Sequence, residues 1–110
     1  MRFHPRIAPV KVGIFPLLKN KPELVAKARA VFESLRRQMT CFYDEGGSIG
    51  KRYARQDEAG TPFCVTIDFE TLGEKGDELK DTVTLRYRDD ARQERVKISD
   101  LAGLLLPQVQ

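Results

Sequence analysis

Two clusters of basic side chains are the groups in this sequence whose types and spacing could do chemistry. The first contains Lys51, Arg52 and Arg55, which would share one flank of a helix at these intervals. They would lie at its amino end, where the helix dipole already supplies partial positive charge, so an anion should compensate them. RNA phosphate could be that anion, and Asp57 and Glu58 within the protein are the alternative.

The second cluster mixes guanidinium groups with carboxylates. A carboxylate accepts from the exocyclic amine of an unpaired base, arginine donates to ring or carbonyl acceptors, and the guanidinium plane can stack on a base. This combination fits the reading of an unpaired base, whereas a network of surface ion pairs is the structural alternative. The members of the cluster are Arg86, Arg88, Asp89, Asp90, Arg92 and Arg95.

A strand over 82–88 would position the second cluster. Apolar and polar residues alternate strictly in this segment, so one face should lie on the core. The same alternation projects Arg86 and Arg88 together from the opposite face. Tyr87 shares the apolar phase, where it either covers the edge of the core or offers a stacking surface.

A glycine-rich turn at 44–47 and a helix from Ser48 to about Glu58 would position the first cluster. Glycine permits a positive φ in the turn, and the Ser48 hydroxyl can cap the helix. Residues 46–50 lack the lysine and spacing of a phosphate-binding P-loop. Their backbone amides could still bind a phosphate, but the residues favour a tight turn followed by a helix cap.

The remaining periodicity predicts further strands and helices around these two clusters. A helix should begin with Asn20 as its cap and Glu23 in a capping-box position. Its apolar face would consist of Leu24, Ala28, Val31, Phe32, Leu35 and Met39. Other strands are expected at 10–15, 41–43, 63–69 and 93–98, a surface connection at 70–81, and a closing helix from Ser99 to 105, before Pro107. We therefore predict an α/β fold with a mixed five-stranded sheet flanked by helices.

Length and composition favour a single soluble domain. The chain has 110 residues, of which 41% are hydrophobic and 32% charged, and it has no apolar run of bilayer length. The net charge of +3 permits an RNA partner without requiring one. The start of the sequence lacks a signal-peptide pattern, so we expect a cytoplasmic protein with no membrane partner.

Catalytic and metal chemistry have little support in the sequence. His4 is the single histidine, and no nucleophile or metal ligand accompanies it in sequence. Cys41 and Cys64 belong to no CxxC pair and lie in apolar segments, so two buried thiols are expected. We expect no catalytic residue, metal or cofactor in this chain.

Three stretches of the sequence form a recognisable combination. They are HPRIAPVKV, FYDEGGSIGKRYARQDEAGTPFCVTIDF and the run Arg86-Tyr87-Arg88-Asp89. Together they resemble the carboxy-terminal anticodon-binding domain of glycyl-tRNA synthetases, from about His4 to Leu106. The family commonly has Arg-Asp-Arg-Asp followed by a methionine, where this chain has Tyr87 and Ala91. The resemblance implies that residues 1–110 form a single anticodon-binding domain.

The resemblance also implies a tRNA partner and a separate catalytic domain. The domain would grip the anticodon stem-loop of glycine tRNA, whose anticodon ends in two cytosines. A separate catalytic domain of the ligase would activate glycine with ATP and Mg, and the full-length protein is expected to be a homodimer. A free-standing, non-catalytic nucleic-acid-binding accessory module of the same fold is the alternative, which an upstream catalytic domain would exclude.

These considerations give a set of candidate nucleic-acid-binding residues. They are Lys51, Arg52, Arg55, Arg86, Arg88, Asp89 and Arg92. The first three would contact phosphates, because they are purely basic. Arg86, Arg88 and Asp89 would read the anticodon bases, because they combine donors with an acceptor.

Overall fold

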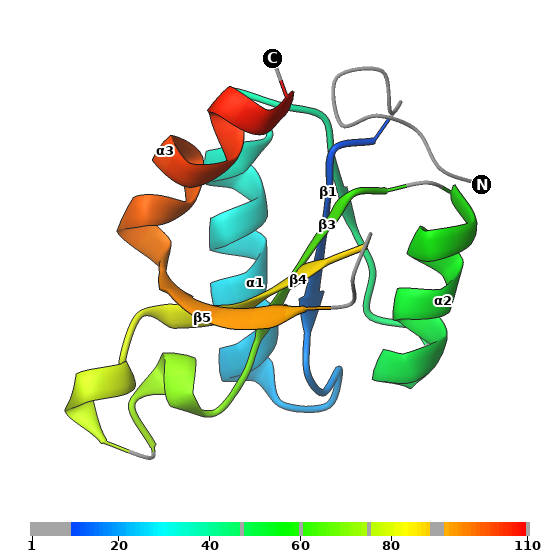
Figure 1. Ribbon diagram of the computed structural model, residues 1–110. Helices are drawn as coiled ribbons and strands as arrows, with labels where there is room; N and C mark the ends of the chain where they lie inside the picture. The colour runs from blue at the N-terminus through cyan, green and yellow to red at the C-terminus, as the bar shows by residue number, and fades with distance from the viewer. Residues whose placement is uncertain (1–9, 47, 60, 75, 89–91, 110) are drawn as a thin grey trace.

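A mixed five-stranded sheet organises the protein (Figure 1). The computed structural model describes residues 10–109 except 47, 60, 75 and 89–91. Its strands are β1 (Val12–Pro16), β2 (Cys41–Tyr43), β3 (Phe63–Ile67), β4 (Thr82–Tyr87) and β5 (Gln93–Lys97). Their order is β2-β1-β3-β4-β5, with β1 parallel to both of its neighbours and β4 antiparallel to both of its own. The predicted α/β architecture is confirmed.

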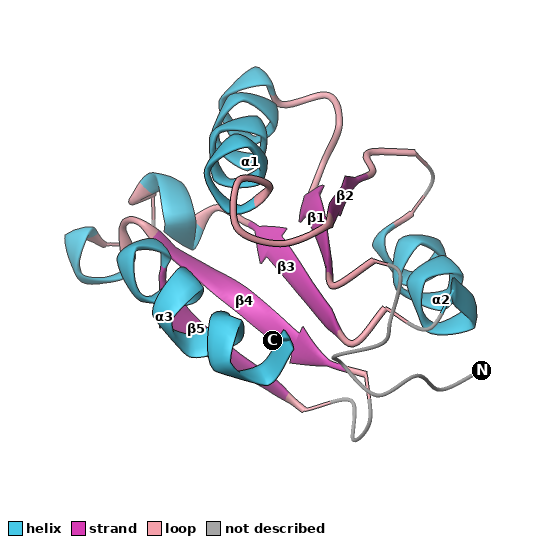
Figure 2. Ribbon diagram, turned by 90° about the horizontal axis from the view of Figure 1, so that it is seen from above, coloured by secondary structure: helices cyan, strands magenta, loops and turns pink. Residues whose placement is uncertain are grey.

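Helices cover both faces of the sheet. Within the described residues they are α1 (Pro22–Leu35), α2 (Ile49–Ala59) and α3 (Ile98–Val109). Figures 1 and 2 show α1 and α3 on one face and α2 on the other. The predicted surface connection between β3 and β4 contains two short 3-10 helices, η1 (Glu70–Leu72) and η2 (Asp77–Leu79).

The main hydrophobic core lies between the sheet and the layer formed by α1 and α3. Successive strand side chains point to opposite faces, so alternate strand residues enter this core. From the strands it receives Val12, Ile14, Phe63, Val65, Ile67, Val83 and Leu85. From the helices it receives Leu24, Ala28, Val31, Leu35, Leu101 and Leu105. The predicted apolar face of α1 is confirmed, although Phe32 is only partly buried and Met39 lies beyond the helix.

The two central strands, β1 and β3, are buried on both faces, because α2 packs on the face of the sheet opposite the main core. The ring of Phe15 meets that of Tyr53 edge to face, with 5.8 Å between the centroids. Gly13 makes this close packing possible. A Cβ at its position would lie 3.0 Å from the Phe15 ring and 3.3 Å from the side chain of Gln56. β3 ends at Ile67, two residues earlier than predicted.

Arg52 of α2 is buried, with 2% of its surface exposed. Its guanidinium group donates to the carbonyl of Pro16 at the end of β1, to that of Leu17 at 3.1 Å, and to that of Asp44 just after β2 at 3.4 Å. The sequence-based prediction that Arg52 shares one flank of the helix with Lys51 and Arg55 is therefore wrong, because those two side chains are exposed. Helical spacing indicates which residues share a flank, but the ends of β1 and β2 decide that this part of α2 faces inward.

Two helix boundaries also differ from the prediction. Lys21, not Asn20, is the N-cap of α1, and no side chain caps the helix, so the predicted capping box is wrong. Glu23 instead forms an ion pair with Lys21 at 3.5 Å. α3 begins at Ile98 and continues through Pro107 rather than ending before it.

Replacing Arg52 with methionine should lower the free energy of unfolding by about 3 kcal/mol, because the buried carbonyls at the ends of β1 and β2 lose their donor. Urea denaturation followed by circular dichroism measures this change. The exposed neighbour Lys51 provides the matched control, since Lys51→Met should change stability by less than about 0.5 kcal/mol. Equal losses in the two variants would contradict the structural role of Arg52.

Candidate functional site

One side of the sheet is only partly covered. α2 packs over β1 and β3, and no helix in the described part of the chain covers β4 and β5 on this side (Figure 2). Residues directly opposite each other in neighbouring strands share a face. The strand register groups Thr66, Thr84, Arg86, Gln93 and Arg95 on this side. We call this surface, together with Tyr53, Asp68 and Glu70 at its border, the open face.

A polar network centred on Asp68 fixes one part of the open face. The Asp68 carboxylate accepts from the Arg95 guanidinium at 2.6 and 3.3 Å and from the Thr84 hydroxyl at 3.0 Å. It also accepts from the Thr71 hydroxyl at 3.0 Å. Arg95 donates further to the hydroxyls of Thr82 at 2.9 Å and Thr84 at 3.0 Å. Arg95 is thus committed to a structural ion pair, although its sequence position grouped it with the base-reading cluster.

The pKa of Asp68 reflects this network. Burial alone would raise the pKa of the carboxyl group, because the charged form loses solvation. Hydrogen bonds from Arg95, Thr84 and Thr71, together with the charge of Arg95, outweigh burial and hold the pKa below its ordinary value. The carboxylate is therefore ionised at neutral pH and holds its donors in fixed positions.

Arg86 lies on the aromatic ring of Tyr53. The guanidinium carbon is 4.7 Å from the ring centroid, a cation–π geometry. The ring itself is fixed, because its hydroxyl group is 2.5 Å from the Thr66 hydroxyl and Phe15 packs against it. The structure therefore orients the guanidinium group of Arg86 at the border between α2 and the open face.

A hollow of about 340 Å³ lies beside this arginine. It is lined by Leu17, Tyr53, Thr66, Asp68, Phe69, Glu70, Thr84 and Gln93. Apolar groups and oxygen-bearing groups both contribute to the lining.

The other residues of the predicted base-reading cluster do not all gather on the open face. Arg92 stacks on the Tyr87 ring at 4.1 Å, and the Tyr87 hydroxyl donates to Glu94 at 2.7 Å. Tyr87 has the core-facing phase of β4, so Arg92 lies with the α1 and α3 side of the sheet, away from Arg86. Arg92 and Arg86 were grouped in one cluster by their sequence positions, but they lie on opposite sides of the sheet.

Arg88 and Asp89 follow the end of β4. The backbone amide of Arg88 donates to the carbonyl of Pro62 at 3.0 Å, and the Arg88 side chain is half-buried. Asp89 lies outside the described residues.

The first basic cluster is divided in a similar way. The Ser48 hydroxyl accepts from the Lys51 amide at 3.3 Å, so the predicted cap of α2 is confirmed, and the Lys51 side chain is exposed. Arg55 donates to the Asp44 carboxylate at 2.6 and 3.2 Å and to the Gly46 carbonyl at 2.7 Å. Asp44 therefore supplies an anion at the amino end of α2.

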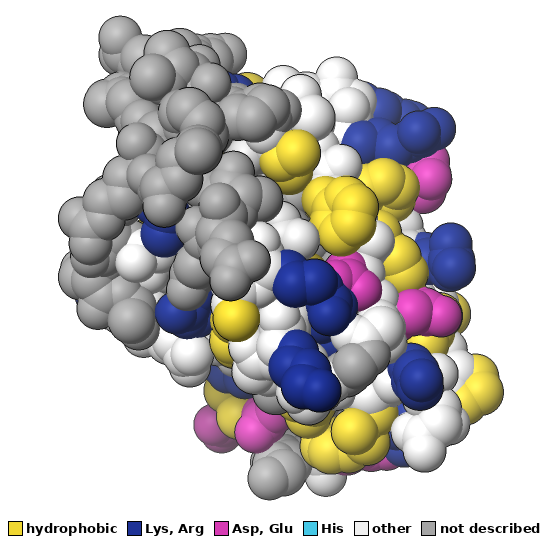
Figure 3. Space-filling model, turned by 90° about the vertical axis from the view of Figure 1, so that its right-hand side faces the viewer, with side chains coloured by type: hydrophobic (Ala, Val, Ile, Leu, Met, Phe, Trp, Pro, Cys, Tyr) yellow, Lys and Arg dark blue, Asp and Glu magenta, His cyan; other side chains and the backbone are white. Residues whose placement is uncertain are grey.

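Asp44 is not one of the anions that the sequence indicated, which were RNA phosphate, Asp57 and Glu58. The side chains of Asp57 and Glu58 lie outside the described residues. The buried Arg52, bound to backbone carbonyls, cannot reach a phosphate at the surface. On the side of the molecule that Figure 3 shows, the described Lys and Arg side chains form separate groups, with carboxylates between some of them.

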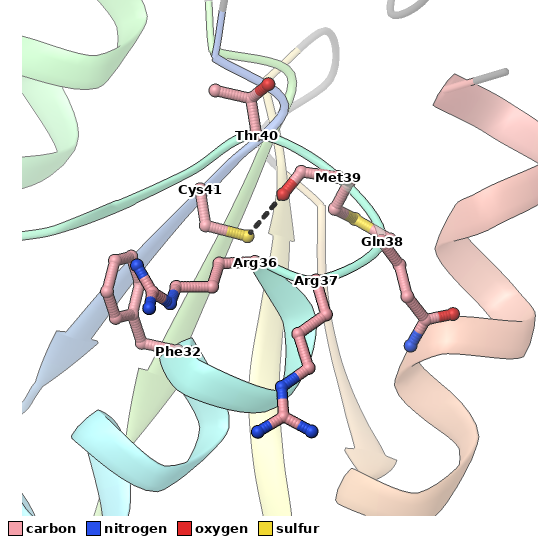
Figure 4. A pocket seen from close by; sticks show the side chains of 7 residues that line it. All are labelled: Phe32, Arg36, Arg37, Gln38, Met39, Thr40 and Cys41. Carbon is pink, nitrogen blue, oxygen red and sulfur yellow. Dashed lines mark hydrogen bonds between the residues drawn. The ribbon is translucent and has the colours of Figure 1, made fainter.

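A larger hollow of about 620 Å³ lies where α1 ends beside β2, at the sheet edge opposite β5 (Figure 4). Arg36 in its lining donates to Glu33 at 2.9 Å and stacks on Phe32 at 5.9 Å. The Cys41 thiol donates to the Met39 carbonyl at 3.5 Å, and burial raises its pKa to about 11. A thiol with this pKa is a weak nucleophile at neutral pH, so the hollow contains no activated cysteine.

The remaining chemistry of the described residues is limited. Cys64 is buried as predicted, whereas Cys41 is only partly buried, and neither forms a disulfide. Among the residues with described positions, no group of three or more His, Cys, Asp or Glu side chains could hold a metal ion. No helix in the described ranges is long and apolar enough to cross a membrane.

Comparison with known proteins gives a consistent result. The model of a family described as "Anticodon binding domain" matches residues 11–107. A glycine–tRNA ligase of Deinococcus radiodurans is 50% identical over an alignment of 108 residues, which covers 94% of this chain and 21% of the relative. Corresponding ligases of Clostridium kluyveri and Streptomyces coelicolor are 49% and 47% identical, over 100% and 96% of this chain and 22% and 21% of each relative. The chain thus spans about a fifth of the length of these relatives.

Replacing Asp68 with asparagine should lower the free energy of unfolding at pH 7 by about 2 kcal/mol, because Arg95 loses its charged partner. The depressed pKa means that the carboxylate contributes its full stability above the unfolded-state pKa of about 3.9 and loses it as the pH falls through the folded-state pKa. Urea denaturation between pH 7 and pH 2.5 should therefore show the variant and the wild type converging below about pH 4. The exposed Asp77→Asn serves as the control, and a constant difference at every pH would contradict the argument.

Proposed function

This chain belongs to the family of anticodon-binding domains, and from this premise we propose that it binds the anticodon stem-loop of glycine tRNA as part of a glycine–tRNA ligase. The choice of glycine is supported by relatives that are named as glycine–tRNA ligases and share about half of their aligned residues with this chain. The ligase would carry out ATP- and Mg-dependent aminoacylation in a separate catalytic domain and act as a homodimer in the cytoplasm. The fivefold greater length of these relatives favours this assignment over a free-standing accessory module.

The single observation that carries the proposal is the open face with Arg86 stacked on Tyr53. Single-stranded RNA is recognised mainly through unstacked bases that pack on flat groups and bond through their edges. A guanidinium plane held against an aromatic ring offers such a flat group, and the neighbouring hollow offers space for a base. Arg88 and Asp89, two and three residues further along the chain, remain proposed base contacts.

We propose fewer phosphate-binding residues than the sequence indicated. Lys51 is exposed at the amino end of α2 and is the proposed phosphate contact of that cluster. Arg55 is half exposed and pairs with Asp44, so it would contribute only if a phosphate shares or replaces that carboxylate. Arg92 would contact RNA from the α1 and α3 side of the hairpin formed by β4 and β5. Arg52 is removed from the proposed interface.

Titration of the chain with anticodon stem-loops tests the proposal directly. Backbone amide shifts should change at Arg86, Gln93 and Lys51 when a glycine anticodon stem-loop is added, and binding of a stem-loop with an unrelated anticodon should be weaker. Equal affinity for both RNAs, or shifts confined to the edge formed by β2, would overturn the proposed function.

Replacing Arg86 with alanine should weaken binding of the glycine anticodon stem-loop by about tenfold to a hundredfold, because a base contact of this kind contributes roughly 1–3 kcal/mol by analogy with base readout in DNA grooves. Fluorescence anisotropy with labelled RNA measures the affinity. Arg37→Ala, at the opposite edge of the sheet, is the matched control and should bind as the wild type does. Identical losses for glycine and unrelated anticodons would assign Arg86 a general electrostatic role instead.

Replacing Lys51 with alanine should weaken binding of glycine and unrelated stem-loops by the same factor, because a phosphate contact carries no base information. The slope of log affinity against log salt concentration should also decrease in magnitude by about one. Anisotropy titrations between 50 and 200 mM salt give this slope. If Lys51→Ala leaves it unchanged, the residue does not contact phosphate.

A further inference from the structure

The hollow at the end of α1 differs in chemistry from the hollow on the open face. It has a volume of about 620 Å³ and is formed by one stretch of chain that runs from the last turn of α1 to the first residue of β2. It is lined by Phe32, Arg36, Arg37, Gln38, Met39, Thr40 and Cys41. The lining has two guanidinium groups, and no aspartate or glutamate is among its described residues. It therefore favours an occupant that carries negative charge.

The two arginines of this hollow have different surroundings. Arg36 donates to Glu33 at 2.9 Å and stacks on the Phe32 ring at 5.9 Å, so its guanidinium group is held in place. Arg37 is exposed, and no residue in the described part of the chain forms an ion pair with it. Figure 4 shows its guanidinium group extending away from Arg36 and Phe32. Arg37 is thus the group that can bind a carboxylate of the occupant.

The rest of the lining is apolar enough to hold a side chain. Met39 is buried, and Phe32 and Cys41 are partly buried against the main core. The Cys41 thiol is already bonded to the Met39 carbonyl, so this part of the hollow offers contact area rather than reactivity. Arginine, methionine and aromatic residues are the types enriched where proteins contact one another. The composition of the hollow therefore favours a protein occupant.

The shape of the hollow also favours a protein over a small molecule. The side chains of Arg36, Arg37, Gln38 and Thr40 are exposed, so the rim lies in solvent. Small-molecule sites usually bury roughly 70–90% of the ligand surface, which a hollow with an exposed rim does not do. A second protein surface can cover the rim and the neighbouring Phe42, which is 44% exposed.

The small extent of this surface selects an occupant from the same polypeptide. Stable contacts between separate proteins use about 20–30 residues on each side, far more than this hollow and Phe42 provide. Contacts within one polypeptide need less area, because the linker keeps the two parts at an effective concentration in about the millimolar range. The chain spans about a fifth of the length of its relatives, so a ligase of the proposed kind contains such further parts.

We propose that this hollow docks an acidic segment from the part of the ligase polypeptide that lies outside this chain. An apolar side chain of that segment would pack against Phe32 and Met39, and a carboxylate would bind Arg37. The inference rests on the proposed function, because it requires a longer ligase. The hollow lies on the α1 side of the sheet, at the edge opposite β5, so the segment and an RNA on the open face can be bound together.

Hydrogen exchange measured by mass spectrometry tests the docking in the full-length ligase without RNA. Backbone amides of residues 37–43 should exchange about tenfold more slowly in the ligase than in the isolated chain, because the docked segment restricts local opening. Arg37→Glu in the ligase should bring this exchange to within about twofold of the isolated chain, because it places a carboxylate against an acidic segment. Lys80→Glu, an exposed residue beside η2, is the matched charge reversal and should keep the slow exchange.

A second variant changes the shape of the hollow without changing its charge. Thr40→Trp should fill the hollow and abolish the slow exchange as Arg37→Glu does. Both positions are exposed, so the urea midpoints of the isolated variants should match that of the wild type, which shows that unfolding does not cause the loss. If both variants keep the slow exchange, the docking site is wrong.

The remaining outcomes separate the other occupants. Equal exchange of residues 37–43 in the isolated chain and the ligase would overturn the inference. Slowing that appears only when glycine tRNA is added would assign the hollow to RNA, and slowing that grows with the concentration of the isolated chain would assign it to a second copy. Either result also overturns the inference. If the ligase binds glycine and unrelated tRNAs equally, the proposed function itself fails, which anisotropy shows independently of the exchange data.

Discussion

The structure depends on one buried interaction, the guanidinium group of Arg52 bound to backbone carbonyls at the ends of two parallel strands. Parallel strands that end side by side leave carbonyl oxygens there without partners, and burial makes such oxygens costly unless a donor reaches them. Arg52 supplies that donor from α2. The next residue, Tyr53, consequently lies over β3 and supports Arg86, so the buried cation also sets the geometry of the surface.

The arginines therefore have different structural roles, which the sequence alone does not distinguish. Arg52 holds strand ends, Arg95 holds a carboxylate, and Arg55 compensates Asp44. Arg86 instead stacks on the aromatic ring of Tyr53, which orients its guanidinium group at the border of the open face. A small domain with a net charge of only +3 can present an oriented cationic group in this way.

Local patterns in the sequence predicted the helices and strands well. They could not predict contacts between residues that lie far apart in the sequence. The alternation over 82–88 correctly separated the core face of β4 from the face of Arg86, and Ser48 correctly marked the start of α2. Helical spacing could not show that Arg52 points inward, because that depends on strands distant in the sequence. The pairing of Asp68 with Arg95 likewise requires the register of β3, β4 and β5. Asp68 directly after an apolar strand and Thr84 in the polar phase were the available signals.

The short edge strand β2 has a consequence for how the protein behaves at high concentration. Cys41–Tyr43 contributes only three residues to the sheet, and Phe42 at its centre is 44% exposed. An unpaired strand edge is a template on which another chain can add a strand and begin aggregation. A segment this brief, with Arg29 stacked on Tyr43 beside it, offers too few backbone groups for such growth. The sheet can thus leave an apolar side chain at its margin without recruiting copies of itself.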